Sequence, residues 1–106
     1  MKHTIDLGDV RMSGRTTIML ATLTGMQKAG FPALYIAMNT PQAALARSRS
    51  GHAIRCAGAD AALSDLIRSA VAIGIDDALQ WDALTRRRVM GWICDNPNLK
   101  LLMKAY

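Results

Sequence analysis

The sequence predicts a three-layer α/β/α sandwich with a five-stranded, mainly parallel sheet, formed by one domain over residues 1–106. Five short β-like runs alternate with helix-like segments along the chain, so the strands need helical crossovers and should run parallel. The run 70–75, AVAIGI, is continuously apolar, as a central strand covered on both faces must be. With 106 residues, of which 51% are hydrophobic, the chain has room for one domain with a sizeable core.

Five β-like runs and four helix-like segments make up this alternation. The predicted strands are His3–Leu7, Ala33–Met38, His52–Ala57, Ala70–Ile75 and Leu99–Met103. The predicted helices are Thr16–Ala29, Gln42–Arg47, Leu63–Ser69 and Asp82–Cys94. Residues Arg47–Gly51 are predicted to form a flexible loop. A helical bundle, in which the β-like runs are pieces of helices, is the alternative fold.

Capping and helix-stopping residues mark most of the predicted helix ends. Gly30 follows the first helix, and Pro32 comes shortly after it. Thr40 and Pro41 offer an N-cap and a first-turn proline for the second helix. Asp82 is a good N-cap for the last helix, and the turn at residues 95–98, DNPN, stops that helix.

The charge balance favours anionic partners. Thirteen Lys and Arg residues stand against eight Asp, and with no Glu in the chain the formal net charge is +5. A nucleotide, a nucleic acid or an acidic protein surface fits this charge, and general solubility explains it as well. Any carboxylate chemistry is restricted to the eight Asp side chains.

The two cysteines and the N-terminal residues indicate in which cellular compartment the protein is expected. Cys56 and Cys94 lie far apart in apolar stretches without CxxC spacing, which predicts two buried, reduced thiols and a cytoplasmic protein. The N-terminus has no apolar signal region, and no run reaches the roughly 18 apolar residues of a membrane span. We therefore expect neither export nor insertion into a membrane.

The segment 7–17, LGDVRMSGRTT, joins the first predicted strand to the first helix. Phosphates bind to backbone N–H groups at a helix N-terminus, where glycine lets the backbone come close. Gly14 would permit that approach, Arg15 would supply positive charge, and the Thr16 hydroxyl would meet a magnesium ion. An ordinary turn followed by a helix cap explains the same residues.

A second segment, 71–77, VAIGIDD, ends an apolar run with two acids. A carboxylate at the end of a buried strand can hold Mg²⁺ through water, and a second acid can orient the attacking water. Asp76 is expected to be the metal-associated acid and Asp77 the general base, although Asp also commonly begins a polar turn. Ligands bind beyond the carboxyl ends of parallel strands, so both segments, together with Asn39, should meet at one rim. Asn39 would there contact a phosphate or a water, or cap the second helix.

These two segments resemble the Walker A and Walker B motifs of P-loop NTPases, in degenerate form. Against the pattern G-x-x-x-x-G-K-[ST], Arg15 stands where the family has lysine, and Asp9 stands at the first glycine, with Gly8 one position early. The loop is similar to those of phage terminase-like ATPases and small phage proteins. The resemblance implies a minimal P-loop-like core that binds ATP or another nucleoside triphosphate with Mg²⁺. It implies phosphate binding by Ser13, Gly14, Arg15, Thr16 and Thr17, metal binding by Thr16 and Asp76, and catalysis by Asp77 and Arg15.

Two classes of function follow from this resemblance. One is a small phage-type P-loop NTPase-fold protein with weak or partner-dependent hydrolysis, because arginine replaces lysine and no second lobe closes over the base. The other is a non-enzymatic phage accessory protein that inhibits a host protein or a defence complex with an eroded P-loop scaffold. Either would act in the host cytoplasm, with a host or phage protein or a second copy of the chain as partner. A DNA-binding module rests on charge alone.

A few other residues have less specific interpretations. Residues 85–88, TRRR, either offer an arginine to a neighbour's nucleotide or a phosphate backbone, or form a solvated helix face. Trp81 and Trp92 are expected to anchor the core or an interface. His3 and His52 are expected at the opposite sheet edge and have no metal-ligand spacing.

Overall fold

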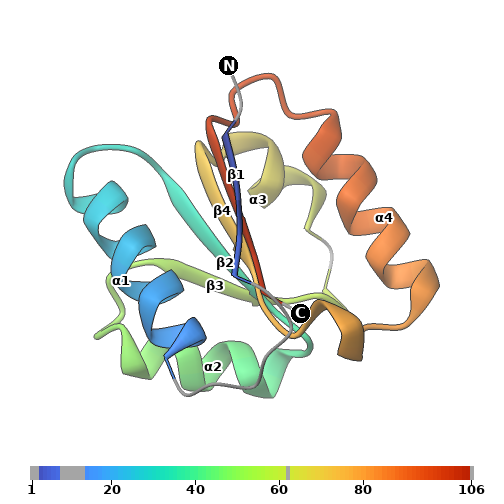
Figure 1. Ribbon diagram of the computed structural model, residues 1–106, viewed down its shortest axis with the longest axis horizontal. Helices are drawn as coiled ribbons and strands as arrows, with labels where there is room; N and C mark the ends of the chain where they lie inside the picture. Colours follow the sequence, from blue (N-terminus) through green and yellow to red (C-terminus); the bar gives the residue numbers. More distant parts are fainter. Residues whose placement is uncertain (1–2, 8–13, 62, 106) are drawn as a thin grey trace.

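A computed structural model describes residues 3–7, 14–61 and 63–105 of the protein, without the side chain of Leu79 (Figure 1). The elements in chain order are β1 His3–Asp6, α1 Arg15–Lys28, β2 Ala33–Ala37, α2 Thr40–Arg49, β3 Arg55–Gly58, α3 Ser64–Ser69, β4 Ala72–Ile75, the short 3₁₀ helix η1 Ala78–Gln80, α4 Ala83–Cys94 and β5 Leu101–Lys104. The five strands form one parallel sheet in the order β1-β5-β4-β2-β3. The predicted α/β class with a parallel sheet is therefore confirmed.

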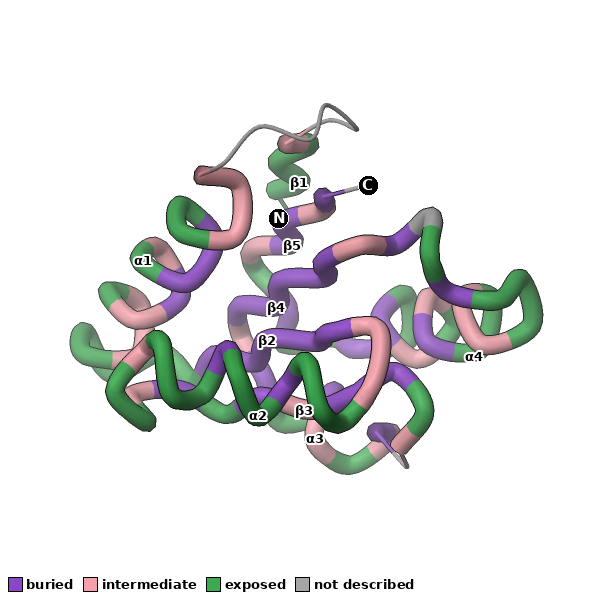
Figure 2. Tube along the Cα trace, turned by 90° about the horizontal axis from the view of Figure 1, so that it is seen from below, coloured by how far each residue is buried: buried purple, intermediate pink, exposed green. Residues whose placement is uncertain are grey.

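Helices cover the sheet on both faces, with α1 and α2 on one face and α3 and α4 on the other (Figure 1). The side chains of β2 alternate between the two layers because successive strand residues point to opposite faces. Tyr35 joins the core cluster with Met19 and Leu23 of α1, whereas Ile36 joins the cluster with Ile67 of α3 and Val89 of α4. Figure 2 shows β2 and β4 buried between these layers. Burial of each such apolar side chain stabilises the fold by about 1.5–3 kcal/mol.

The first strand lies at one edge of the sheet and is the least covered strand. All four of its residues are exposed, and Figure 2 shows β1 as an exposed segment beyond β5. It pairs with β5, with His3 opposite Leu101, so β5 separates it from β4. The first crossover thus starts from an edge strand, while α1 packs over the inner strands β2 and β4.

The end of α2 and the start of β3 differ from the predictions. The predicted loop Arg47–Gly51 is wrong, because α2 continues to Arg49 and places two arginines in its last turn, where positive charge favours the helix end. The prediction that β3 begins at His52 is also wrong. Gly51 and His52 adopt left-handed conformations, with φ of 67° and 61°, and close the helix, so β3 begins only at Arg55.

The predicted caps of the other helices have mixed outcomes. Asp82 is confirmed as the N-cap of α4, where its carboxylate accepts a hydrogen bond from the Thr85 N–H at 2.8 Å. The cap of α2 is Asn39 rather than Thr40, since the Asn39 Oδ1 accepts from the Gln42 N–H at 2.9 Å.

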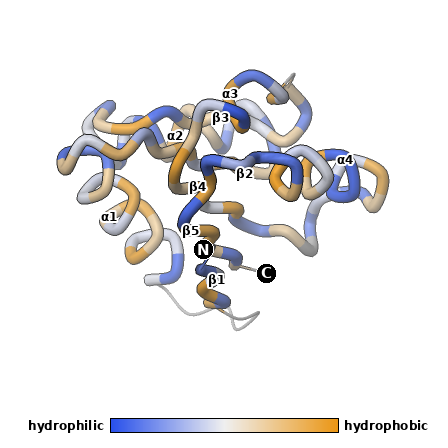
Figure 3. The backbone as a smooth tube through the Cα atoms, turned by 90° about the horizontal axis from the view of Figure 1, so that it is seen from above, coloured by the Kyte–Doolittle hydropathy of each residue, from blue (hydrophilic) through white to orange (hydrophobic). Residues whose placement is uncertain are grey.

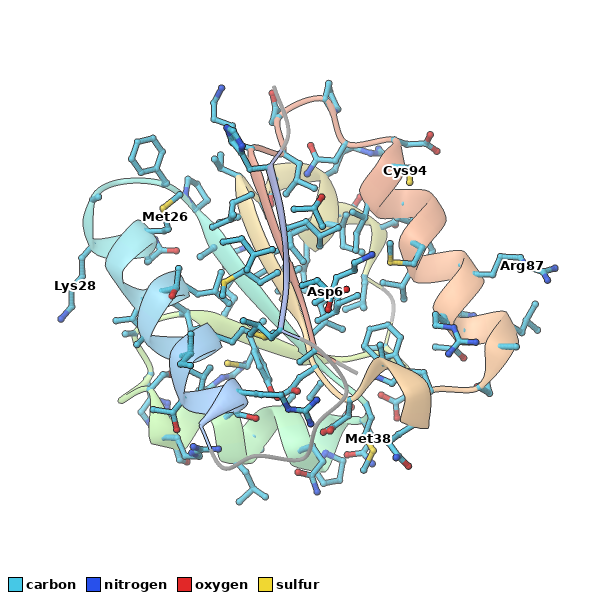
Figure 4. All side chains as sticks on the ribbon, viewed as in Figure 1. Asp6, Met26, Lys28, Met38, Arg87 and Cys94 are labelled. Atoms are coloured by element: carbon cyan, nitrogen blue, oxygen red, sulfur yellow. The ribbon has the colours of Figure 1, made fainter. Side chains whose placement is uncertain are left out.

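The two cysteines lie in different environments. Cys56 is buried as predicted, but the prediction for Cys94 is wrong, because this residue lies on the exposed face of α4 (Figure 4). The 3.6-residue period of the helix turns this position away from the sheet, although the two residues before it, Trp92 and Ile93, are apolar. Within the described part of the chain, no helix combines the length and apolar character needed to cross a bilayer.

Candidate functional site

A crevice opens beyond the carboxyl ends of β4, the central strand, and its neighbour β2. These strands are neighbours, but β2 leads to α2 on one face and β4 leads to η1 and α4 on the other. Such a point of divergence is where open α/β sheets bind their ligands. A hollow of about 290 Å³ lies here, lined by Thr16, Tyr35, Gln42, Leu45, Ala46, Ser48, Arg49, Asp76 and Asp77.

Asp76 is the buried acid at the base of this crevice. It follows β4 directly and is only 2% exposed. Its Oδ2 accepts hydrogen bonds from the Thr16 hydroxyl and the Tyr35 hydroxyl, each at 2.6 Å, and its Oδ1 accepts from the Asp77 N–H at 2.9 Å. The two short distances are typical of hydrogen bonds to a charged acceptor. Three donors from three parts of the chain therefore satisfy a carboxylate that would otherwise be costly to bury.

The backbone of Asp76 is held as firmly as its side chain. Its N–H donates to the Ile36 carbonyl at 3.0 Å, which continues the pairing between β4 and β2. Its carbonyl accepts from the Trp81 Nε1 at 3.1 Å. Trp81 is buried in the core, as expected, so the acid sits on a rigid frame.

Thr16 reaches Asp76 because α1 begins directly above the end of β4. Gly14 is the N-cap, with φ of 126°, a conformation that L side chains rarely adopt. Its carbonyl accepts the first helical hydrogen bond, from the Ile18 N–H at 2.8 Å. Because Thr16 belongs to the first turn of α1, the positive end of the helix dipole lies beside the Asp76 carboxylate. None of the described residues in that turn is acidic.

Tyr35 is a site residue that the sequence analysis missed. Burial raises the pKa of its hydroxyl well above the ordinary value, and the hydrogen bond to Asp76 and the negative charges of Asp76 and Asp77 raise it further. The side chain is therefore a neutral donor. One feature of the sequence could have indicated Tyr35: it carries the one hydroxyl of the otherwise apolar strand β2, and a buried tyrosine hydroxyl needs a hydrogen-bond partner.

Arg49 is the second site residue that the sequence did not assign to the crevice, since beside Arg47 it indicated only a basic patch. Its Nη2 donates to the Thr17 Oγ1 at 3.0 Å and thereby links the end of α2 to the start of α1. It also lines the crevice, as Asp76 and Asp77 do. The sequence analysis predicted a flexible loop here, and the orientation of a side chain on such a loop cannot be predicted, whereas Arg49 in fact lies in the last turn of α2.

The structure brings some of the predicted site residues together and separates others. Thr16, Asp76 and Asp77 line the same hollow, and Asp77 adopts a left-handed conformation with φ of 53°. Thr17 faces a neighbouring groove between α1 and α2, whereas the half-buried Arg15 lines neither of these two hollows. Ser13 lies outside the described residues.

The oxygen donors in the crevice fit Mg²⁺ better than a transition metal. No group of three or more His, Cys or Asp side chains gathers for a metal among the residues that the structure describes. Mg²⁺ is usually held by one or two protein oxygens, with phosphate oxygens and waters as the remaining ligands. The Thr16 hydroxyl and the Asp76 carboxylate, 2.6 Å apart, are such a pair.

The arginine run of α4 lies away from this crevice, on the other face of the sheet. Figure 3 shows the run as a hydrophilic stretch of α4, and Figure 4 shows Arg87 projecting outward. The Arg86 Nη1 donates to the Ala78 carbonyl at 3.2 Å, and the Arg88 guanidinium lies 5.5 Å from the ring centroid of Trp92. Two of the three arginines thus have local structural partners.

No protein-family model matches the chain, and no curated protein matches it in sequence.

Proposed function

We propose that the protein binds a nucleoside triphosphate together with Mg²⁺ in the crevice, with weak or partner-dependent hydrolysis. The observation that supports this most directly is the 2.6 Å hydrogen bond between Thr16 and Asp76. These residues are 60 positions apart and belong to the two segments that resemble Walker A and Walker B. A phosphate-binding helix end and a metal-associated acid have to lie side by side in such a site.

The same hydrogen bond suggests what ligand binding would change. In the structure, the Thr16 hydroxyl donates to Asp76. In the proposed complex, this hydroxyl would turn to the metal and the phosphates, while Tyr35 and the Asp77 N–H would keep the Asp76 carboxylate in place. Bound Mg²⁺ would neutralise charge on the transferring phosphoryl group. Gly14, Arg15, Thr16 and Thr17 would supply backbone and side-chain donors to the phosphates.

One feature supports weak rather than rapid hydrolysis. Arg15 stands where the P-loop family has a lysine, and its forked guanidinium is bulkier than the compact ammonium of a lysine. The strand order bears on the geometry of the site: β1 is an edge strand separated from β4 by β5, so the strand before α1 does not pair with the strand before Asp76. The proposal therefore rests on the local geometry of α1 against β4. A neighbouring molecule that closes over the crevice would be required for fast turnover.

Thermal unfolding with and without Mg-ATP or Mg-GTP tests the proposal. A ligand at ten times its Kd that binds only the folded state adds about 1.4 kcal/mol of stability. For a domain of this size, that raises the unfolding midpoint by about 5–10 °C. Thr16→Ala should abolish the shift, and chelation of Mg²⁺ should reduce it. Thr22→Ala is the matched control, because Thr22 lies on the same helix and its hydroxyl bonds within its own turn, to the Ile18 carbonyl at 2.8 Å.

An unchanged midpoint at millimolar nucleotide would overturn the nucleotide proposal and favour the non-enzymatic accessory protein. A shift that persists in Thr16→Ala would show that nucleotide binds elsewhere. Phosphate release from Mg-ATP, compared between the unmodified protein and Asp77→Asn, then tests hydrolysis separately from binding.

A further inference from the structure

A second and larger hollow lies beside the crevice, in the groove between α1 and the end of α2. Its volume is about 470 Å³. It is lined by Thr17, Leu20, Ala21, Thr24, Gly25 and Lys28 of α1 and by Arg49 and Ser50 at the end of α2. Lys28 is at the far end of α1, with its side chain projecting outward (Figure 4). Thr17 to Thr24 spans about 10 Å along the helix at the usual rise per residue.

The groove and the crevice share Arg49 as a lining residue. Arg49 also donates a hydrogen bond to Thr17, which lines the groove. Thr16 and Thr17 are consecutive residues of α1, yet the first lines the crevice and the second lines the groove. A ligand whose anionic end occupies the crevice would therefore extend past Arg49 into the groove.

The size and chemistry of the groove match the part of a nucleotide that the crevice does not hold. The crevice, at about 290 Å³, is slightly below the usual range of small-molecule sites, whereas the groove falls within it. The exposed Ala21 and the small accessible part of the largely buried Leu20 provide apolar surface for a planar base, and the hydroxyls of Thr24 and Ser50 can bond ribose or base edges. Lys28 and Arg49 add positive charge at the two ends of the groove.

We propose that the α1–α2 groove binds the nucleoside of the nucleotide whose triphosphate and magnesium occupy the crevice. This assignment rests on the proposed function and adds the place of the base and ribose. Arg49, which lines both hollows, then contacts the phosphate chain and exchanges its hydrogen bond with Thr17 for one to phosphate.

Gly25→Leu is the variant that tests this assignment. A Cβ at Gly25 meets nothing within 4 Å, so the new side chain fills groove space without displacing the protein. Gly91→Leu is the matched control, since Gly91 is also helical with open space around its Cβ but lies on α4, on the other face of the sheet. Affinities for Mg-ATP, Mg-GTP and Mg-tripolyphosphate are measured by titration calorimetry for the unmodified protein and both variants.

We expect Gly25→Leu to weaken nucleotide binding by about tenfold or more while tripolyphosphate binding stays within about twofold. Gly91→Leu should leave all affinities within about twofold. Unchanged nucleotide affinity in Gly25→Leu, or an equal loss for nucleotide and tripolyphosphate, would overturn the groove assignment and leave the proposed function standing. If the unmodified protein binds tripolyphosphate as tightly as nucleotide, the assignment is also wrong. If it binds neither, the proposed function itself fails.

Discussion

Two side-chain hydroxyls offset the cost of burying the Asp76 carboxylate in the crevice. A buried carboxylate needs donors, and Asp76 obtains two of its three from the side chains of Thr16 and Tyr35, which converge on the same oxygen. If Thr16 turns to a ligand, Tyr35 is the hydroxyl that still holds this oxygen. Tyr35 is therefore expected to support the fold in both states, whereas Thr16 serves the ligand-bound state.

Tyr35→Phe should lower the stability of the folded protein and change its pH dependence. Loss of a hydrogen bond to a charged acceptor costs about 1.5–3 kcal/mol near neutral pH. Because the pKa of Tyr35 is raised in the folded state, its contribution is complete below the unfolded pKa of about 10 and declines as pH rises above it. Urea unfolding between neutral pH and about pH 11 measures both effects. A gap between the two proteins that does not narrow above pH 10 would contradict this account of Tyr35.

The two thiols should react at very different rates. Burial raises the pKa of Cys56 to about 11, with a smaller opposing effect from the positive charge of Arg47, whereas Cys94 is exposed. Reactivity requires both access and thiolate, so an alkylating reagent near pH 7.5 should label Cys94 first and Cys56 only on unfolding. Peptide mapping by mass spectrometry after timed quenching identifies the labelled residue. Rapid labelling of Cys56 in the native protein would show that the sheet face under α2 opens readily.

At the scale of elements, the close contact between α1 and β4 brings the helix end to the acid. An added Cβ at Gly74 of β4 would lie 2.7 Å from the Cγ and Sδ of Met19 and 2.9 Å from the Cδ1 of Leu23. Both of these side chains belong to α1 and are fully buried, and because protein interiors are close-packed they can make room only by displacing their own neighbours. The absence of a side chain at Gly74 lets α1 sit low enough for Thr16 to reach Asp76.

Gly74→Ala should therefore destabilise the protein by about 1–3 kcal/mol, the usual cost of overpacking a filled core. Gly25→Ala, in α1, should instead stabilise the protein by about 0.5–1 kcal/mol, because alanine favours a helix and its Cβ meets open space. Chemical denaturation of the two variants beside the unmodified protein gives both values. Equal effects of the two substitutions would contradict the close packing of α1 on β4.

At the scale of the whole molecule, the sheet is stable in its centre and weakly held at one edge. The strands β2 and β4 have partners on both sides and helices on both faces, whereas β1 has one partner and four exposed residues. Local stability follows the burial around a segment, so the edge should open independently of the centre.

Native-state hydrogen exchange should show this gradient. Amides of β2 and β4 are expected to exchange only through global unfolding, and amides of β1 through local opening at a lower free energy. The backbone bond from the His3 N–H to the Lys100 carbonyl, at 2.8 Å, belongs to the weakly protected group. Exchange followed by mass spectrometry on peptides that separate β1 from β5 checks the order. Protection of β1 equal to that of β4 would mean that something covers this edge in solution.

The sequence alone determined the class of the fold, the five strands and the Asp82 cap, because hydrophobic periodicity and capping preferences are local properties of the chain. It also predicted that the loop before Thr16 and the acid Asp76 share one rim, since parallel strands place all their carboxyl ends on the same edge. The strand order, the partners of Asp76 and the exposure of Cys94 were decided only by the tertiary structure. Tyr35 and Arg49 reach the crevice because of the order in which the strands lie in the sheet, and no local sequence pattern encodes that order. Packing between distant segments sets the order. It places Tyr35 of β2 and Arg49 of α2 in the same crevice as Thr16 and Asp76, which the motifs had singled out.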